Sequence, residues 1–465
     1  MSWDDFAKHA KDAADWGADY HKTLRDRPVR AQTAPGAIKA QLGATPPEDG
    51  TDLAAIMADF ENIVMPGVTH WQHPRFFAYF NSNAAPASVL AEFLAAIIAP
   101  QCMLWQTSPA ATEMETRMMD WLCHGLGLPD IYQGVIQDSA SSATLAAVLT
   151  MRERALAFRG NIEGLHGQPR LRIYCSDQVH SSIDRAIWVA GIGQDNLVKI
   201  ASKGDLRYMD PVALEAAIKE DKAAGRVPAG IIAATGATGM GACDDLEAVA
   251  AIAKTHDLFT HLDAAWAGTA MICPEFRSLW AGADQFDSIV FNPHKWLGVQ
   301  FDCAAHFLRD PDQLRQTLAI RPEYLKTHAT EEVTDYSEWS IPLGRRFRAL
   351  KLWFLMRHYG MEGLRARIRN HVKWSQGLCE QLRAHGGFTI VTDPILSLWT
   401  FKVAGASDDD TQTLVDAIND DGRIYLTQTL VDGQKVIRFT AGQFDCEKRD
   451  FDTALEAITD VAARV

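Results

Sequence analysis

The stretch Ser288-Ile289-Val290-Phe291-Asn292-Pro293-His294-Lys295-Trp296 joins a run of β-branched and aromatic residues to an Asn-Pro turn and a lysine. Such a run, ended by turn residues, predicts a buried strand over 288–291. Similar short runs alternate with alanine-rich amphipathic stretches between about 130 and 310: Leu171–Cys175, Gly230–Ala234 and Phe259–Asp263. This alternation predicts an α/β fold with a mostly parallel sheet covered by helices.

Outside this region the pattern changes twice. Residues 1–80 are helix-prone with no strand pattern of their own, so they predict a helical N-terminal arm. After residue 345 a long helical pattern leads to a stretch containing Leu396–Trp399 and Lys435–Phe439. We therefore predict an arm over 1–80, a large domain over 81–345 and a small α+β domain over 346–465.

Composition narrows the class of function. The 465 residues carry a formal charge of −14 and no run of Lys or Arg, which argues against a nucleic-acid or anionic-membrane partner. The eight scattered cysteines form no C-x-x-C pair and are expected to be reduced, and the N-terminus lacks the features of a secretory signal, so we expect a cytoplasmic location. The apolar stretch Pro86–Trp105 is interrupted by Glu92 and is interpreted as a helix buried in protein, with a subunit contact as one place for it.

Lys295 is the first candidate for chemistry. Because ligands of open α/β sheets bind beyond the carboxyl ends of the strands, a lysine just past 288–291 is well placed to meet one. Partial desolvation there favours the neutral amine that reacts with an aldehyde. A lone lysine is more often a surface residue with a buried stem, so its neighbours decide between the two interpretations.

Other predicted strand ends carry polar groups of matching chemistry. Asp263 ends an apolar run and suits a protonated ring nitrogen, although a helix cap is equally compatible with the local sequence. The segment Gln137–Thr144 opens an alanine-rich helix whose free N–H groups suit a phosphate. His180 follows another strand and can stack on an aromatic ring, although a structural histidine is the more usual case, and Thr238 offers a hydroxyl. Together with Lys295 these residues predict a pyridoxal-phosphate (PLP) site.

The same residues resemble the group II PLP-dependent amino-acid decarboxylases, most closely the aromatic-L-amino-acid decarboxylases. The similarity runs through most of the chain, in the motifs Val68–Trp71, Phe76–Phe80, Ser108–Ala110, Thr112–Glu115, Met119–Leu122, Ser176–Gln178, Asn292–Trp296 and Ile341–Arg348. The resemblance implies PLP-dependent transferase fold type I (aspartate aminotransferase-like). It also implies a homodimer with active sites shared between subunits and the N-terminal arm packed on the neighbour.

The resemblance further implies roles for individual residues. Lys295 would carry the cofactor, Asp263 would hold the pyridine nitrogen and His180 would stack on the ring. The remaining cofactor-binding positions would be Ser139, Ala140, Ser141, Thr238, Ala265, Asn292 and His294. A substrate pocket would be supplied by Trp71, Tyr79, Phe80, Ser82, Met103, Trp105 and Gly344.

The family's mobile loop carries a tyrosine, which matches Tyr324 in Arg321–His328. A hydroxyl there can protonate Cα after carbon dioxide leaves, so Tyr324 favours simple decarboxylation. The related aldehyde synthases usually have phenylalanine at this position. The implied activity is a lyase reaction on tryptophan, 5-hydroxytryptophan, DOPA, tyrosine or phenylalanine, and Gly344 favours a substrate as large as an indole.

Alternatives remain open at this point. An aldehyde synthase or a decarboxylase of an acidic amino acid would use the same fold, although Arg75 is the one arginine within the aromatic segment at residues 71–83. A non-catalytic protein is disfavoured by intact Lys295, Asp263, His180 and Tyr324. His70 and His73 lack the third ligand of a metal site, so no metal is expected. Trp266, Asn81 and Ser82 depart from the family pattern, which leaves the substrate less defined than the reaction.

Overall fold

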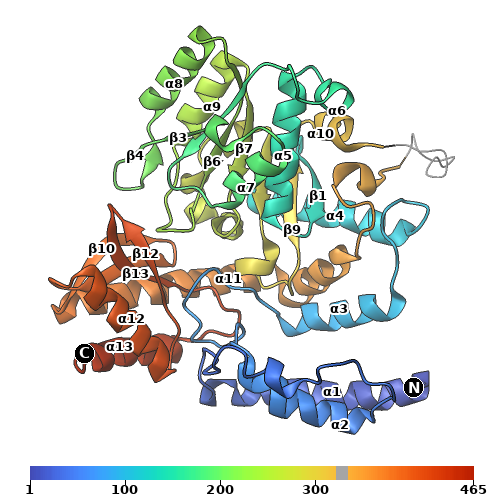
Figure 1. Ribbon diagram of the computed structural model, residues 1–465, viewed down its shortest axis with the longest axis vertical. Coiled ribbons are helices and arrows are strands. Elements are labelled where there is room, and N and C mark those ends of the chain that lie inside the picture. The colour runs from blue at the N-terminus through green and yellow to red at the C-terminus, as the bar shows by residue number, and fades with distance from the viewer. Residues whose placement is uncertain (321–332) are drawn as a thin grey trace. The chain divides into compact units, whose positions relative to one another are not determined.

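The computed structural model of the protein describes residues 1–320 and 333–465. These residues form two compact units (Figure 1). The large unit comprises residues 82–373 and 393–399, and the small unit comprises 1–81, 374–392 and 400–465. The units follow spatial proximity rather than chain order, and the three-part division expected from the sequence stays a prediction.

Within the described ranges, seven strands form the sheet of the large unit in the order β1-β9-β8-β7-β6-β2-β3. The five adjacent strands β8, β7, β6, β2 and β3 run parallel to one another, whereas β9 is antiparallel to both β1 and β8. The predicted mostly parallel sheet is therefore confirmed. The strands are β1 (Gln133–Gln137), β2 (Leu171–Ser176), β3 (Leu197–Ile200), β6 (Val227–Ala234), β7 (Phe259–Asp263), β8 (Ser288–Phe291) and β9 (Ala304–Leu308).

Helices pack along this sheet. The alanine-rich α5 lies against β6, β7, β8, β9 and β1, while α8 and α9 lie against β6 (Figure 1). Small side chains on α5 let it approach the sheet closely, because Ala143, Ala146 and Ala147 are almost fully buried. The helices of this unit are α3 (Pro86–Ile98), α4 (Pro109–Leu126), α5 (Ala140–Ala155), α6 (Gly160–Glu163), α7 (Ser182–Val189), α8 (Pro211–Ala223), α9 (Leu246–His256) and α10 (Pro311–Leu318). A short pair, β4 (Ser202–Lys203) and β5 (Tyr208–Met209), lies outside the main sheet.

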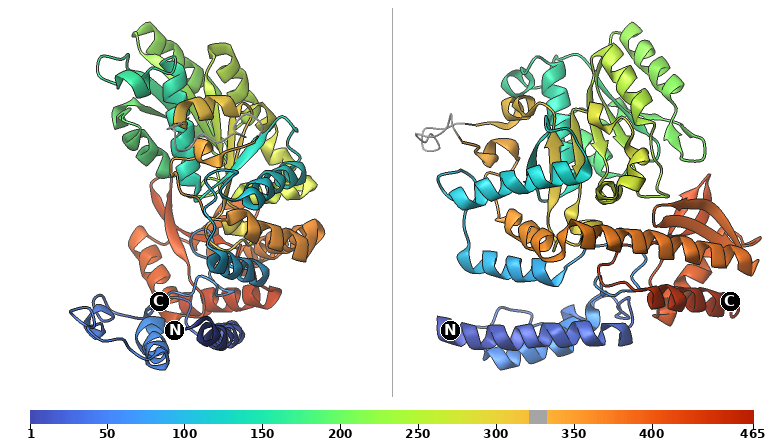
Figure 2. Two further views of the ribbon diagram at one scale, coloured as in Figure 1. Left: turned by 90° about the vertical axis from the view of Figure 1, so that its right-hand side faces the viewer. Right: turned by 180° about the vertical axis from the view of Figure 1, so that it is seen from behind.

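The small unit contains a four-stranded sheet in the order β10-β11-β13-β12. The long helix α11 (Arg348–His385) contributes residues to both units and leaves helical geometry at Gly360, where φ is +64°. At the N-terminus, α1 and α2 lie side by side (Figure 2), and Trp16 of α1 contacts Phe60 at 5.2 Å between ring centres. The other elements are α1 (Trp3–Thr23), α2 (Leu53–Asp59), β10 (Phe388–Ile395), β11 (Leu398–Val403), α12 (Asp408–Asp421), β12 (Thr427–Val431), β13 (Gln434–Thr440) and α13 (Lys448–Ala462).

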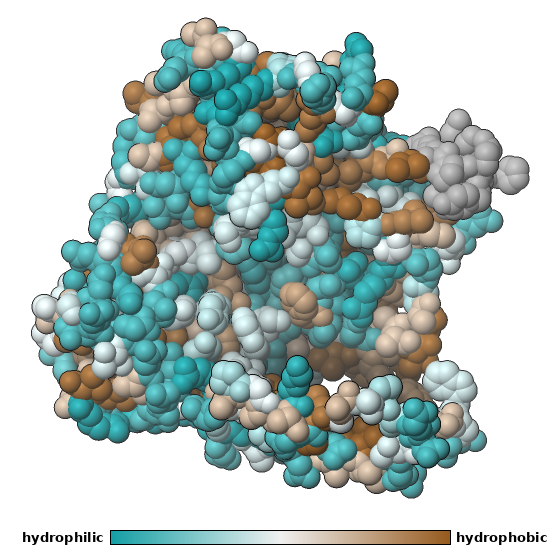
Figure 3. Space-filling view, viewed as in Figure 1, coloured by the Kyte–Doolittle hydropathy of each residue, from teal (hydrophilic) through white to brown (hydrophobic). Residues whose placement is uncertain are grey.

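The helix expected over Pro86–Trp105 is shorter than predicted, and its apolar face is not covered within the single chain. The helix α3 ends at Ile98, because Ala99 adopts a left-handed conformation with φ +47° and Pro100 cannot continue a helix. Its apolar side chains are exposed in this chain, with Leu90 at 54% and Ile98 at 63%. Hydrophobic surface, coloured brown, is visible in the region of α3 (Figure 3). No helix in the described ranges combines the length and apolar character needed to cross a membrane.

Candidate active site

The carboxyl ends of parallel strands bring the predicted residues to one edge of the large sheet. In the register of the sheet, Asp263 at the end of β7 lies between Ala234 of β6 and Val290 of β8. The backbone N–H of Ala264 donates to Val290 O at 2.9 Å, and that of Asn292 donates to Ala265 O at 2.9 Å. These bonds fix the exit of β8 beside the exit of β7.

Lys295 lies in the short helical turn Pro293–Leu297 that follows β8. It is half-buried, as expected for a lysine at the end of a buried strand. Its own backbone is not helical (φ −85°, ψ −105°), although its N–H still donates to Asn292 O at 2.9 Å. The following residue, Trp296, is buried and stacks on Trp266 at 4.9 Å, which packs the turn onto the segment after β7.

His180 shares this neighbourhood. Burial lowers its pKa below the usual 6.5, the charge of Asp263 opposes that change, and the charge of Lys295 adds to it. The structure therefore brings His180, Asp263 and Lys295 together. The backbone N–H of Ser182 donates to His180 Nδ1 at 3.1 Å, so the neutral ring carries its proton on Nε2. The Asp263 carboxylate accepts a bond from the Ala265 N–H at 3.0 Å.

The predicted phosphate-binding segment lies beside these residues. Ser139 caps α5, its hydroxyl accepting from the Ser142 N–H at 3.2 Å. Ala140 of the first helical turn packs with Val290 and Ala265, so the start of α5 meets the exits of β7 and β8. Ser141, in the same first turn of α5, is exposed. A helix start with free N–H groups is suited to a phosphate dianion.

Two further buried polar atoms suit a bound ligand: the Thr235 hydroxyl can donate to an anion, whereas Asn292 Oδ1 can only accept from a donor. Asn292 Oδ1 and Thr235 Oγ1 are buried and have no hydrogen-bond partner among the described residues. A buried polar atom left unpaired is costly, which favours a ligand that supplies the missing partner. Burial lowers the pKa of His294 to about 3, and its Nδ1 accepts from the Cys303 N–H at 2.9 Å, so the ring is neutral. Half-buried Thr238 lies in the turn after β6, and Ala237 beside it packs on Val179 next to His180. The residues present therefore fit PLP.

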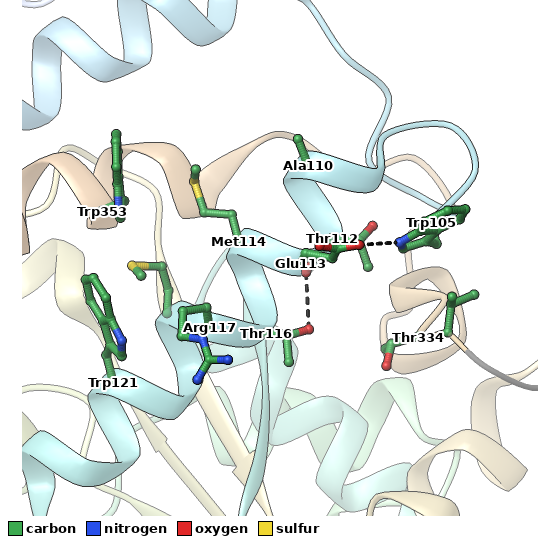
Figure 4. A pocket seen from close by; sticks show the side chains of 12 residues that line it. Trp105, Ala110, Thr112, Glu113, Met114, Thr116, Arg117, Trp121, Thr334 and Trp353 are labelled. Atoms are coloured by element: carbon green, nitrogen blue, oxygen red, sulfur yellow. Dashed lines mark hydrogen bonds between the residues drawn. The ribbon is translucent and has the colours of Figure 1, made fainter.

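The predicted substrate residues divide between the two units. In the small unit Trp71 stacks on Tyr79, with ring centres 5.9 Å apart, and Phe80 follows directly. Ser82, Met103, Trp105 and Gly344 belong to the large unit. Trp105 lines a cavity of about 640 Å³ on α4, where its indole N–H donates to Glu113 at 3.0 Å (Figure 4).

Gly344 lines a different cavity, of about 340 Å³, with Gln101 and Arg345. Neither of these two cavities is lined by Lys295, His180 or Asp263. Within the large unit the structure thus brings together Lys295, Asp263, His180 and the start of α5, whereas the predicted substrate residues are divided between the units and, in the large unit, between two cavities. Tyr324 lies outside the described residues.

Sequence reasoning missed two residues that adjoin the aromatic segment. Arg438 of β13 donates to Tyr79 O at 2.9 Å and its guanidinium lies 4.6 Å from the centre of the Phe80 ring. Burial lowers its pKa to about 9. Tyr425 contacts Tyr79 at 6.0 Å between ring centres, and burial, reinforced by a hydrogen bond with Tyr79, raises its pKa to about 12. Both come from more than 300 residues away, so no local pattern marks them.

Comparison with known proteins places this geometry in context. The family model described as the pyridoxal-dependent decarboxylase conserved domain matches residues 35–404. The chain is 39% identical to aromatic-L-amino-acid decarboxylase of Mus musculus, covering 99% of this chain and 98% of the relative. It is 36% identical to phenylacetaldehyde synthase of Arabidopsis thaliana, covering 97% and 94%. The crystal structure of Oryza sativa TDC with PLP and tryptamine superposes with a TM-score of 0.96 at 34% identity, covering 100% and 99%.

Proposed function

Because the chain belongs to the pyridoxal-dependent decarboxylase family, we propose that it converts an aromatic L-amino acid and a proton to the arylalkylamine and carbon dioxide. It is a PLP-dependent carboxy-lyase of fold type I. The observation that carries the proposal is the meeting of Lys295, Asp263 and His180 in a chain similar over nearly its whole length to aromatic decarboxylases.

When bound, PLP supplies an electron sink for the pair left on Cα as carbon dioxide departs. Lys295 would carry it, and the Asp263 carboxylate would hold a proton on the pyridine nitrogen. His180, with its own proton on Nε2, would hold the ring. The start of α5, through Ser139, Ala140 and Ser141, would hold the phosphate together with Asn292 and His294. Thr238 and Ala265 complete the set of cofactor-binding residues.

Proton delivery decides between the two reactions of such a site. A decarboxylase returns one proton to Cα, whereas an aldehyde synthase consumes dioxygen and water there and releases aldehyde, ammonia and hydrogen peroxide. We propose that the Tyr324 hydroxyl delivers the proton to Cα. Because the chain is also similar to phenylacetaldehyde synthase of Arabidopsis thaliana, we keep the aldehyde synthase reaction as the alternative.

The proposed substrate pocket favours an aromatic ring over an acidic side chain. Trp71, Tyr79 and Phe80 are aromatic, and Met103 and Trp105 add apolar surface. Arg75 donates to Arg25 O and Arg438 donates to Tyr79 O, so each guanidinium has one of its five N–H donors bonded to the backbone of its own chain. Ser82 and Gly344 leave room at the pocket, and Gly344 favours an indole, so we propose tryptophan among the substrates.

We further propose a homodimer with shared active sites. The exposed apolar face of α3 and the N-terminal helices α1 and α2, in which no residue is buried, suit a second copy of the chain. A shared site would also bring substrate residues from two chains to one cofactor. We propose a cytoplasmic location as well, since all eight cysteines lie in the described ranges, are buried and form no disulfide there, as in a reducing compartment.

The replacement Tyr324→Phe tests the assignment of the proton donor. With PLP-loaded protein and an aromatic amino acid, the amine released per carbon dioxide should fall, and hydrogen peroxide and ammonia should take its place. The control Tyr208→Phe removes a hydroxyl from a half-buried tyrosine between β4 and β6 and should keep the original product ratio. Unchanged amine yield from Tyr324→Phe would remove Tyr324 from the mechanism.

A further inference from the structure

The turn that carries Lys295 is bonded to the segment just before α3. Four hydrogen bonds join residues 82–88 to residues 294–300, all within the large unit. The Asn83 N–H donates to His294 O at 2.9 Å, the Ala85 N–H donates to Gly298 O at 3.0 Å, and the Gln300 N–H donates to Ser88 Oγ at 2.7 Å. The fourth bond joins Asn83 Nδ2 to Lys295 O.

Asn83 holds both carbonyls that flank the reactive side chain. Asn83 is 1% exposed, so its backbone N–H and its side-chain amide are both shielded from water. Lys295 departs from helical geometry inside a helical turn, which directs its carbonyl away from the helix axis and toward a partner outside the turn. The Asn83 side chain is that partner, 212 positions away in the chain.

We propose that Asn83 is a positioning residue for Lys295. By fixing the carbonyls of His294 and Lys295, it sets the direction in which the lysine side chain leaves the turn and keeps the amine beside Asp263 and His180. The inference rests on the proposed function, in which Lys295 carries PLP. Asn83 touches neither cofactor nor substrate in this account and acts through the backbone of the turn.

The alternative is that Asn83 merely stabilises the join between the two segments. Ser88 then offers a matched comparison, because its hydroxyl is buried in the same join but accepts from Gln300, five residues beyond Lys295. Asn419 offers a second comparison. It is also a buried asparagine, and its side chain donates to a backbone carbonyl, Leu426 O at 3.1 Å, in the small unit.

The test measures the rate at which full-length protein loses PLP, followed by the cofactor's absorbance after dilution into a PLP-trapping reagent. Asn83→Ala should release PLP about tenfold faster, as expected when a buried carbonyl loses its donor. The thermal midpoint of the cofactor-free protein should fall no further than that of Ser88→Ala. Neither Ser88→Ala nor Asn419→Ala should change PLP release more than about twofold.

Asn83→Asp provides a second variant of nearly the same shape that lacks the donor, and it should release PLP at least as fast as Asn83→Ala. Equal PLP release by the Asn83 and Ser88 variants would overturn the proposal. Borohydride reduction followed by peptide mass spectrometry separates this failure from failure of the proposed function. PLP attached to a residue other than Lys295 in the unaltered protein would refute the role of Lys295 itself.

Discussion

The buried ion pair between Glu115 and Arg345 gives the sharpest prediction for stability. Glu115 of α4 accepts from the Ile136 N–H of β1 at 2.8 Å and from Arg345, whose guanidinium also donates to Ile136 O at 3.1 Å. The two side chains are 4% and 2% exposed. The replacement Glu115→Gln keeps the shape but leaves the guanidinium buried without a counter-charge.

Breaking one side of a buried pair costs about 3–5 kcal/mol, because the remaining charge stays out of water. A large domain loses roughly 2 °C of midpoint per kcal/mol, so the thermal midpoint of Glu115→Gln should fall by about 6–10 °C. Differential scanning calorimetry of the cofactor-free protein measures this change.

The replacement Glu215→Gln is the matched control, because Glu215 pairs with Lys219 on the surface of α8. Water screens such a pair, so its loss should leave the midpoint within the error of the measurement. A midpoint for Glu115→Gln within 2 °C of the unaltered protein would refute the reasoning. The buried pair would then contribute no more than the surface one.

Two further predictions concern acid stability and substrate choice. Burial lowers the pKa of His306 to about 3, so between pH 6.5 and pH 3 the unfolded chain binds a proton there that the folded chain does not. As the pH falls through this range, the site should remove about 1.4 kcal/mol of folding stability per pH unit. Chemical denaturation of His306→Asn at several pH values should therefore show a smaller loss of stability with falling pH. In the proposed substrate pocket a serine at position 344 would take up room that an indole needs, so Gly344→Ser should lower kcat/KM for tryptophan relative to phenylalanine about tenfold. An unchanged ratio would remove Gly344 from the substrate pocket.

The shared neighbourhood of Asp263, His180 and Lys295 could be predicted from sequence because each follows a strand with a clear pattern, while their roles toward PLP stay a proposal. The observed strands Phe259–Asp263 and Ser288–Phe291 have the predicted bounds, and the carboxyl ends of parallel strands meet at one edge. Once the strands were recognised, their topology placed Asp263, His180 and Lys295 together. The start of α5 followed from the same logic, since a serine before an alanine-rich run is typical of a helix cap.

The residues that support this site could not be predicted, because their partners are distant in the chain. Arg438 reaches Tyr79 across 359 positions and Asn83 reaches Lys295 across 212. No local pattern records such contacts. The exposure of α3 in the single chain could not be predicted either, because an apolar helix has the same sequence whether its own chain or another covers it. Its exposed Leu90 and Ile98 illustrate that limit.

The most direct test of the proposed function follows carbon dioxide, amine and hydrogen peroxide together, with PLP-loaded protein and tryptophan, DOPA, phenylalanine or glutamate in parallel. We predict one amine per carbon dioxide from at least one aromatic substrate, little peroxide, and no turnover of glutamate. Peroxide equal to carbon dioxide would make the protein an aldehyde synthase, and turnover of glutamate alone would contradict the aromatic pocket.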